Sequence, residues 1–173
     1  MHPYPNSFNT SARWLKVSIK EQCLYLLNAA QEILASWPVS TAKNGTGEQE
    51  NSGCTPRGWH KIKLKIGEGA DKQAVFVGRR PTGEIYTPQL AVLYPNRDWI
   101  LGRILWLTGL EQGKNRGGQQ DTLRRFIYFH ATPDTEPMGV PLSHGCIRLH
   151  PNTMLEVFAA VEVGTRVFIE DLS

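Results

Sequence analysis

Several short stretches of this chain alternate apolar with polar residues, a pattern typical of β-strands. Leu15, Val17 and Ile19 alternate near the start, and such a period of two predicts a half-buried strand. Short continuous apolar runs predict further strands when turn residues flank them. On these grounds we expect strands within residues 14–19, 59–66, 74–77, 100–108, 126–130 and 166–170.

The stretch 59–66 alternates most regularly. Its isoleucines and leucine, at positions 62, 64 and 66, are predicted to share one face, and its lysines, at 61, 63 and 65, to share the other. This is the pattern of a strand with one solvated face. A lysine stripe also permits nucleic-acid binding, but a single alternating strand is weak support for it, so no nucleic-acid partner is expected.

Residues 20–37 permit two interpretations. Their apolar positions recur at helical spacing with good helix formers between them, which favours a helix. Tyr25 and Trp37 suit strands instead, and two strands joined by a turn would also fit the stretch. The pattern alone favours the helix.

One helix is predicted clearly near the C-terminus. Thr153 and Glu156 have the spacing of a capping box, in which a hydroxyl and a carboxylate satisfy free N–H groups at a helix start. Met154, Leu155, Phe158 and Val161 form an apolar face, and Gly164 is placed to end the helix. Glycine-, proline- and asparagine-rich stretches predict loops over 41–57 and 111–121 and a mostly turn-like segment over 79–96.

Length and composition indicate one domain. The 173 residues are enough to bury a core without disulfides. We expect an irregular lead-in over 1–13 and a single domain over 14–173. The net charge of +3 is a weak indication of anionic substrates.

Cysteine content and the amino terminus bear on the compartment. Cys23, Cys54 and Cys146 are odd in number, so they cannot all pair internally, and reduced thiols fit a reducing compartment. The N-terminal residues have no basic start followed by an apolar stretch, and no membrane segment is apparent. We therefore expect a cytoplasmic protein if Met1 is the native start, and a periplasmic one if a leader has been removed.

The candidate chemistry lies in Ser143-His144-Gly145-Cys146-Ile147-Arg148-Leu149. An apolar run, 126–129, ends at His130, and the proline-rich loop after it can return Cys146 to the end of that strand. A thiol facing a fixed imidazole is the basic unit of cysteine-nucleophile acyl transfer. Charged His130 and Arg148 are expected to lower the pKa of the Cys146 thiol. Gly145 would let backbone N–H groups approach a developing oxyanion.

Two other interpretations of these residues are open. Cys146 could be a small buried hydrophobe, although its histidine, glycine and arginine neighbours suit a core poorly. His130, His144, Cys146 and His150 could instead bind zinc, but no second cysteine lies nearby. We expect no metal and no cofactor.

The block Ser-His-Gly-Cys-Ile-Arg, preceded by His-x-x-Pro at a strand end, resembles the signature of the YkuD-type L,D-transpeptidases. Further similar blocks are 37–41, 55–58 and 78–83, so the resemblance covers about Trp14 to Asp171. It implies a mainly β, twisted sandwich-like domain with one well-marked helix near the C-terminus. It also implies that 20–37 form two strands with a turn near 28–30, and this replaces the helical interpretation.

The resemblance implies roles for individual residues. Cys146 would be the nucleophile and His130 the base, while His144, Gly145 and Ser143 would shape the site and its oxyanion donors. Arg148 would either bind a substrate carboxylate or brace the loop. Ala131 stands where the family often has glycine, so its methyl group could narrow the substrate pocket.

The resemblance further implies action on peptidoglycan stem tetrapeptides or muropeptides, at the bond between the L-centre of the third residue (diaminopimelate) and D-alanine. The expected compartment favours an L,D-carboxypeptidase that releases D-alanine during peptidoglycan recycling. The first alternative is an L,D-transpeptidase that forms crosslinks or exchanges D-amino acids in the periplasm. The second, from another class, is a non-catalytic peptidoglycan-binding module. The sequence leaves the oligomeric state open.

Overall fold

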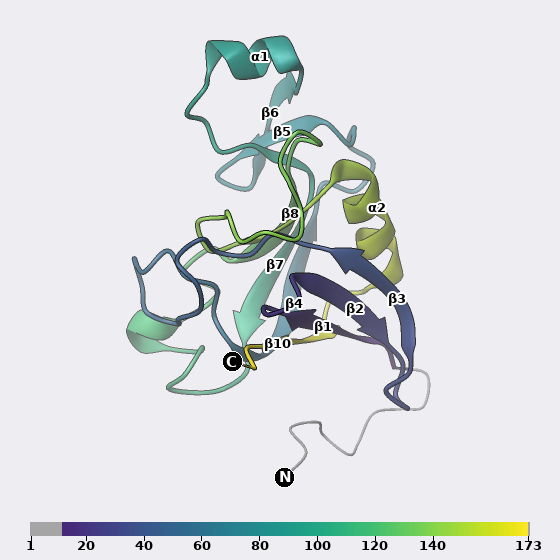
Figure 1. Ribbon diagram of the computed structural model, residues 1–173, viewed down its shortest axis with the longest axis vertical. Helices are drawn as coiled ribbons and strands as arrows, with labels where there is room; N and C mark the ends of the chain where they lie inside the picture. Colours follow the sequence, from purple (N-terminus) through teal and green to yellow (C-terminus); the bar gives the residue numbers. More distant parts are fainter. Residues whose placement is uncertain (1–11, 173) are drawn as a thin grey trace.

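A computed structural model of the protein describes residues 12–172, and most of the predicted lead-in over 1–13 lies outside this range. The protein is mostly β, as predicted, and its strands form one ten-stranded network in the order β3-β2-β1-β10-β4-β7-β5-β6, with β8 joined to β7 and β9 to β8 (Figure 1). The strands are β1 Trp14–Ser18, β2 Cys23–Leu27, β3 Ile33–Pro38, β4 Gly58–Ile66, β5 Ala74–Val77, β6 Arg80–Ile85, β7 Ile100–Gly109, β8 Tyr128–Ala131, β9 Ile147–Leu149 and β10 Arg166–Glu170.

The stretch 20–37 forms β2 and β3, two antiparallel strands, so the interpretation taken from the family resemblance is confirmed. Asn28 makes the turn between them: its carbonyl oxygen accepts from the N–H of Gln31 at 3.0 Å, and its side-chain oxygen accepts from the N–H of Glu32 at 3.0 Å. Asparagine side chains favour such turns because they bond to nearby backbone groups. This local turn overrides the helical spacing of the apolar residues.

The prediction that Ile62, Leu64 and Ile66 share one face of a strand is wrong. The register between β4 and β7 shifts between Ile62 and Leu64, so Ile62 is fully buried while Leu64 is exposed. A β-bulge has this effect because one extra residue reverses the alternation of side chains. Lys65 consequently turns inward, and its Nζ donates to the carbonyl oxygens of Phe158 and Val161, both at 2.7 Å.

The prediction that 79–96 is mostly turn-like is also wrong. The segment contains strand β6 and a short helix, α1 Pro88–Leu93. The Thr87 side chain accepts from the N–H of Leu90 at 3.0 Å, and Pro88 occupies the first turn, where its missing N–H is harmless. The proline therefore begins a helix here. With β5 and β6, α1 forms the projection at the top of Figure 1.

The main helix lies near the C-terminus as predicted, but its predicted ends are wrong. The helix α2 runs Pro151–Ala160 and has His150 as its N-cap residue, with no side-chain capping bond. Thr153 therefore lies inside the first turn, and Glu156 accepts a hydrogen bond from Trp37 Nε1 at 2.8 Å instead of completing a capping box. The helix ends at Ala160, before Gly164, because Val161 already has an extended backbone.

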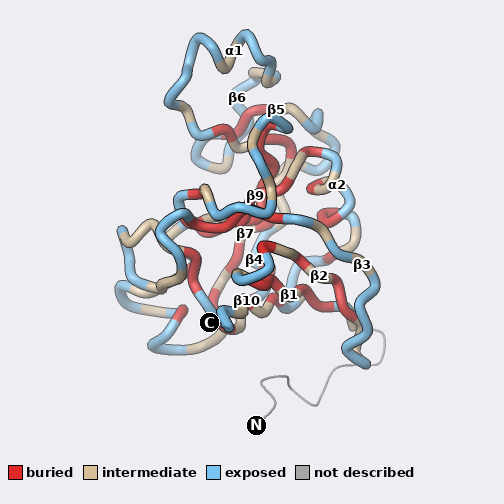
Figure 2. Tube along the Cα trace, in the orientation of Figure 1, coloured by how far each residue is buried: buried red, intermediate tan, exposed pale blue. Residues whose placement is uncertain are grey.

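The core lies between α2 and the sheet. Met154, Val157 and Phe158 of α2 pack into the same buried cluster as Leu105 of β7 and Phe129 of β8. Figure 2 shows the buried segments gathered along the sheet and on part of α2, whereas the α1 projection is exposed. Within residues 12–172 no helix is both long and apolar enough to span a membrane. The packing fixes β8 and β9, the two strands that carry the predicted site.

Candidate active site

The thiol of Cys146 lies at the entrance to β9 and is held by two backbone groups of the segment before β8. Its Sγ donates to the carbonyl oxygen of Phe126 at 3.3 Å and accepts from the N–H of Tyr128 at 3.4 Å. The side chain packs against a buried cluster that includes Phe76 and Tyr128. Both bonds suit a protonated thiol, because the sulfur acts once as a donor and once as an acceptor.

His130 lies in the middle of β8, is only 1% exposed, and is in register with Arg148 of the parallel neighbour β9. Side chains two residues apart along a strand share a face, so His130 lies on the same side as Tyr128, whose N–H contacts the thiol. Cys146 directly precedes β9 and His130 lies on the neighbouring strand β8, so the structure places the two residues on adjacent segments. That they act as a pair stays a prediction.

The imidazole of His130 is oriented by the backbone. Its Nδ1 lies 2.8 Å from the carbonyl oxygen of Ala131. Because a carbonyl oxygen only accepts, Nδ1 must carry the hydrogen and Nε2 must carry the lone pair. The imidazole consequently has one basic atom, Nε2, for which residues 12–172 supply no hydrogen-bond donor.

Burial dominates the electrostatics of the pair. It raises the pKa of the Cys146 thiol to about 12, and the nearby carboxylate of Asp98 raises it further, against the lowering by the Tyr128 N–H and by Arg148. Burial also lowers the pKa of His130 below its usual value. The expectation of a net lowering of the thiol pKa is therefore wrong. Both pKa shifts favour the uncharged forms, a neutral thiol at Cys146 and a neutral imidazole at His130.

Asp98 is part of this site and is not indicated by the sequence. It lies just before β7, and its Oδ1 accepts from Arg148 Nη2 at 2.8 Å. Its Oδ2 lies 3.6 Å from Nδ1 of His144, a side chain that is 80% exposed. In the sequence Asp98 is an acidic residue between a turn-like segment and an apolar run. That arrangement is too common to indicate a site residue.

Arg148 is buried and largely committed to the protein. Besides its bond to Asp98, its Nη1 donates to the carbonyl oxygen of Leu142 at 3.4 Å. Its Nε is buried and has no hydrogen-bond partner among residues 12–172. These contacts tie β9 to the loop before it and to the segment before β7.

The turn that presents Cys146 is tightly constrained. Ser143 Oγ donates to the carbonyl oxygen of Cys146 at 2.5 Å and accepts from the N–H of Gly145 at 3.2 Å. Gly145 has a φ of +135°, and a Cβ at this position would lie 3.3 Å from the carbonyl oxygen of Cys54. A side chain would therefore be strained as well as crowded here. Thr55 Oγ1 holds the turn from the other side by donating to the Gly145 carbonyl oxygen at 2.9 Å.

A second arginine supports the loop against which this turn packs. The two terminal nitrogens of Arg125 donate to the carbonyl oxygens of Gly47, Glu48 and Cys54 and to Ser52 Oγ, at 2.7–3.3 Å. All four acceptors lie in the predicted loop 41–57. Although this loop lacks regular structure, it is fixed directly behind Gly145.

Two cavities meet at His144. One, of about 380 Å³, is lined by Glu50, Asn51, Gly53, Arg124, Arg125, Phe126, Ile127 and His144. The other, of about 210 Å³, is lined by Pro95, Asn96, Arg97, Asp98, Trp99, Thr132, Glu136, Leu142, His144 and Arg148. His144 thus borders both cavities, and its role in shaping the site stays a prediction.

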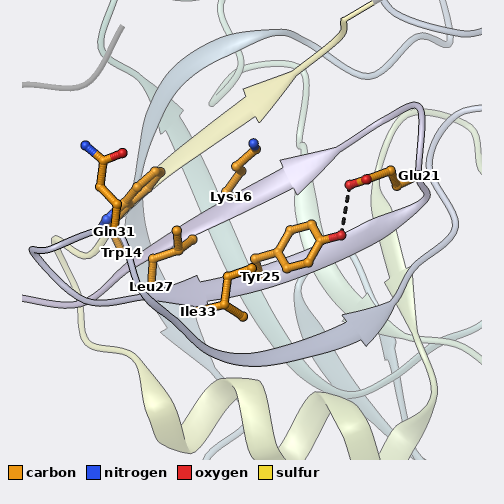
Figure 3. A pocket seen from close by; sticks show the side chains of 7 residues that line it. All are labelled: Trp14, Lys16, Glu21, Tyr25, Leu27, Gln31 and Ile33. Atoms are coloured by element: carbon orange, nitrogen blue, oxygen red, sulfur yellow. Dashed lines mark hydrogen bonds between the residues drawn. The ribbon is translucent and has the colours of Figure 1, made fainter. Parts of the chain in front are cut away.

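A third cavity, of about 330 Å³, lies on the β1–β3 meander and contains none of the predicted site residues (Figure 3). Within residues 12–172, no group of three or more histidine, cysteine or acidic side chains is arranged to hold a metal ion. The expectation that the protein needs no metal stays a prediction.

Comparison with known proteins identifies the family. Residues 12–169 match the YkuD family, described as the L,D-transpeptidase catalytic domain. YqjB of Bacillus subtilis (strain 168), whose name places it provisionally among the L,D-transpeptidases, is 40% identical over 47 residues, which are 27% of this chain and 27% of YqjB.

Solved structures share the fold. An L,D-transpeptidase from Mycobacterium smegmatis has a TM-score of 0.54 at 18% identity and 92% coverage of this chain. LdtMt1 in complex with imipenem has a TM-score of 0.54 at 21% identity and 92% coverage of this chain. Residues 123–326 of the L,D-transpeptidase from Xylanimonas cellulosilytica have a TM-score of 0.53 at 16% identity and 96% coverage of this chain. This chain spans 59–64% of the three solved chains. The likeness in fold agrees with the match over residues 12–169, and the chain belongs to the YkuD family of L,D-transpeptidase catalytic domains.

Proposed function

We propose that this protein is a cysteine acyl-transferase that cleaves the bond between the third residue and D-alanine of a peptidoglycan stem tetrapeptide. The observation that carries the proposal is the hydrogen bond from His130 Nδ1 to the Ala131 carbonyl oxygen, which leaves Nε2 as the basic atom of an imidazole on β8, the strand next to the segment that carries Cys146. Family membership supports peptidoglycan peptides as the substrate class. The oriented histidine and intact thiol argue against a module that only binds peptidoglycan.

The acylation step follows from this arrangement. His130 Nε2 takes the proton of the Cys146 thiol while Sγ attacks the carbonyl carbon of the third residue. The resulting tetrahedral oxyanion is bound by backbone N–H groups of the 144–146 turn. Because the Gly145 N–H already donates to Ser143 Oγ, we assign this role to the N–H groups of His144 and Cys146. The C–N bond then breaks, His130 returns the proton to the departing amine, and D-alanine leaves a thioester on Cys146.

Deacylation uses the same groups in reverse. His130 Nε2 takes a proton from the acceptor, the acceptor attacks the thioester carbon, and the C–S bond breaks. The sulfur then recovers its proton from His130. With water as acceptor the product is a tripeptide with a free carboxylate, and with an amine it is a crosslinked or exchanged peptide.

The remaining residues position these groups. Arg148, buried and bonded to Asp98, braces β9 against the segment before β7, so we favour bracing over carboxylate binding for this residue. His144 is exposed between the two cavities and contacts substrate without acting as the base. Ala131 supplies the carbonyl oxygen that orients His130, and its buried methyl group packs in the core.

We propose water as the main acceptor, which makes the protein an L,D-carboxypeptidase of peptidoglycan recycling. The support is chemical: Cys23 and Cys54, like Cys146, are free thiols, and unpaired thiols suit the reducing cytoplasm, where soluble fragments meet abundant water. The second candidate is an L,D-transpeptidase, which the names of the solved relatives favour.

Competition between acceptors tests this proposal. Disaccharide tetrapeptide is incubated with the enzyme, with and without an added D-amino acid, and the products are separated and weighed by mass spectrometry. The carboxypeptidase predicts tripeptide as the main product in both reactions. Predominantly exchanged or dimeric product would assign the protein to the transpeptidases, and fractionation of native cells for the untagged protein gives an independent result on its compartment.

A further inference from the structure

Arg79 occupies an unusual backbone position in the turn between β5 and β6. Gly78 has a φ of +55° and Arg79 a φ of +66°. Two-residue hairpin turns of this kind favour glycine at the second position, because a left-handed backbone is unfavourable for residues with a side chain. An arginine at this position is therefore unfavourable for the backbone, and such strain is often found where a side chain has a function.

The side chain of Arg79 is fixed by three aromatic residues. Its Nη1 donates to the hydroxyl oxygen of Tyr128 at 2.9 Å. Its guanidinium carbon lies 4.2 Å from the ring centre of Phe126 and 5.1 Å from that of Trp106. These contacts set the plane of the guanidinium and leave most of its N–H groups unused.

Arg79 has no acidic partner in the part of the chain that the structure describes. No carboxylate within residues 12–172 forms an ion pair with it, whereas Arg97 pairs with Glu84 and Arg148 with Asp98. Arg125 is bonded to backbone carbonyls instead. A half-buried, oriented cation without a counter-charge is suited to bind an anionic ligand.

The residues that hold Arg79 also hold the thiol. The carbonyl oxygen of Phe126 accepts from Cys146 Sγ, and the N–H of Tyr128 donates to it. Arg79 contacts the side chains of these same two residues. The side chains of Phe126 and Tyr128 therefore lie between its guanidinium and the backbone groups that bind the sulfur. Phe126 is 47% exposed and also lines the larger cavity beside His144.

We propose that Arg79 binds a carboxylate of the stem peptide, namely the carboxylate at the end of the third residue's side chain. This inference rests on the proposed function, and it makes the enzyme selective for third residues that carry a second carboxylate, as diaminopimelate does. The scissile carbonyl of that residue must reach Cys146, and its long side chain then extends over Phe126 and Tyr128. The terminal carboxylate of D-alanine is attached much closer to the scissile bond and does not reach the guanidinium.

The test compares three tetrapeptides with two variants. The peptides carry a free diaminopimelate side-chain carboxylate, the same carboxylate as an amide, or a free side chain with D-alaninamide at the terminus. Arg79→Gly removes the side chain and suits the left-handed backbone, so the turn is retained. Arg80→Gln, at the exposed next position, is the matched control.

For the wild type and Arg80→Gln, amidation of the side-chain carboxylate should lower kcat/KM by about ten- to hundredfold, the range of a hydrogen bond to a charged group. For Arg79→Gly the free and amidated side chains should be used equally well. An equal loss on all peptides would show a purely structural role and overturn the proposal. The proposal would also be overturned if Arg79→Gly lowered kcat/KM for both peptides with a free D-alanine carboxylate but not for the peptide that ends in D-alaninamide.

Binding separates this inference from the proposed reaction. In a Cys146→Ala background, which cannot form a thioester, the Kd of the free-carboxylate peptide should rise by the same factor on Arg79→Gly, and that of the side-chain amide should not change. This pattern would support Arg79 even if the wild type released no D-alanine, in which case only the proposed function would fail. No change in either Kd would overturn the role of Arg79.

Discussion

Nδ1 of His130 donates its hydrogen to the carbonyl oxygen of Ala131 at 2.8 Å. This single bond selects the tautomer of a buried imidazole and leaves Nε2 as its only basic atom. Because the acceptor is a backbone atom, we expect the alanine found here to serve as well as the glycine often found at this position in the family. Burial favours the neutral imidazole by lowering its pKa, which is the form that the proposed function requires of a base near neutral pH.

The two histidines of the site should respond differently to substitution. His130→Ala removes the general base and is expected to reduce kcat by about 10²–10⁴-fold. His144→Ala should leave measurable turnover, with an effect mainly on KM, because this side chain is exposed between the cavities. Steady-state kinetics of D-alanine release measure both. Complete loss from His144→Ala alone would reverse the assignment.

Imipenem, the compound present in the LdtMt1 complex, offers a β-lactam carbonyl as a probe of the proposed function, which predicts that Cys146 is the residue it acylates. The thiolate opens the β-lactam ring and forms a thioester that retains all atoms of the compound. Intact-protein mass spectrometry should show one adduct on the wild type, on Cys23→Ser and on Cys54→Ser, and none on Cys146→Ser. An adduct that persists in Cys146→Ser would place the reactive nucleophile elsewhere.

Asp98 should contribute to stability through Arg148. In Asp98→Asn the buried guanidinium loses its negative partner, and we expect the free energy of unfolding to fall by about 1–3 kcal/mol. Asp134→Asn is the matched control, because Asp134 is exposed and lies 4.0 Å from His150; it should change stability by less than about 1 kcal/mol. Urea denaturation compares them, and equal effects would argue against the brace.

Stability should fall as the pH falls from 6.5 toward 4. Burial lowers the pKa of His60 to about 4, where its ring is bonded to the Gly58 carbonyl oxygen and Thr122 Oγ1. In this window the unfolded chain binds a proton that the folded chain does not, so acid favours unfolding by up to about 1.4 kcal/mol per pH unit. His130 acts in the same direction.

Urea unfolding at pH 7.5 and pH 5.5 measures this dependence above the range in which carboxylates titrate. His60→Gln should be less stable than the wild type but should show a shallower loss between the two values. Stability that is unchanged or higher at pH 5.5 in the wild type would contradict the account.

The sequence indicates Cys146 and His130 because neighbouring residues mark them: Cys146 lies in a short motif, and His130 lies at the end of an apolar run. It does not indicate Asp98 or Arg79, since their partners, Arg148 and Tyr128, are 50 and 49 positions away. Those contacts depend on how the segments before β7 and between β5 and β6 return to β8 and β9. No pattern of neighbouring residues in the sequence predicts these contacts.

Two errors have the same origin. The lowered thiol pKa expected from the neighbouring cations ignores burial, which depends on the packing of Cys146 against the buried cluster that includes Phe76 and Tyr128. The regular alternation expected for β4 ignores a bulge that turns Lys65 toward the end of α2. In both cases contacts between residues distant in sequence produce a result that the local sequence does not predict.

The most direct measurement follows tetrapeptide cleavage in ¹⁸O-labelled water by wild-type protein and by Cys146→Ala. Attack of water on a Cys146 thioester predicts tripeptide with one ¹⁸O in its new carboxylate, together with an equal amount of D-alanine, from the wild type. Cys146→Ala should yield neither product while unfolding as cooperatively as the wild type. Tripeptide formed by Cys146→Ala at the wild-type rate would contradict the account.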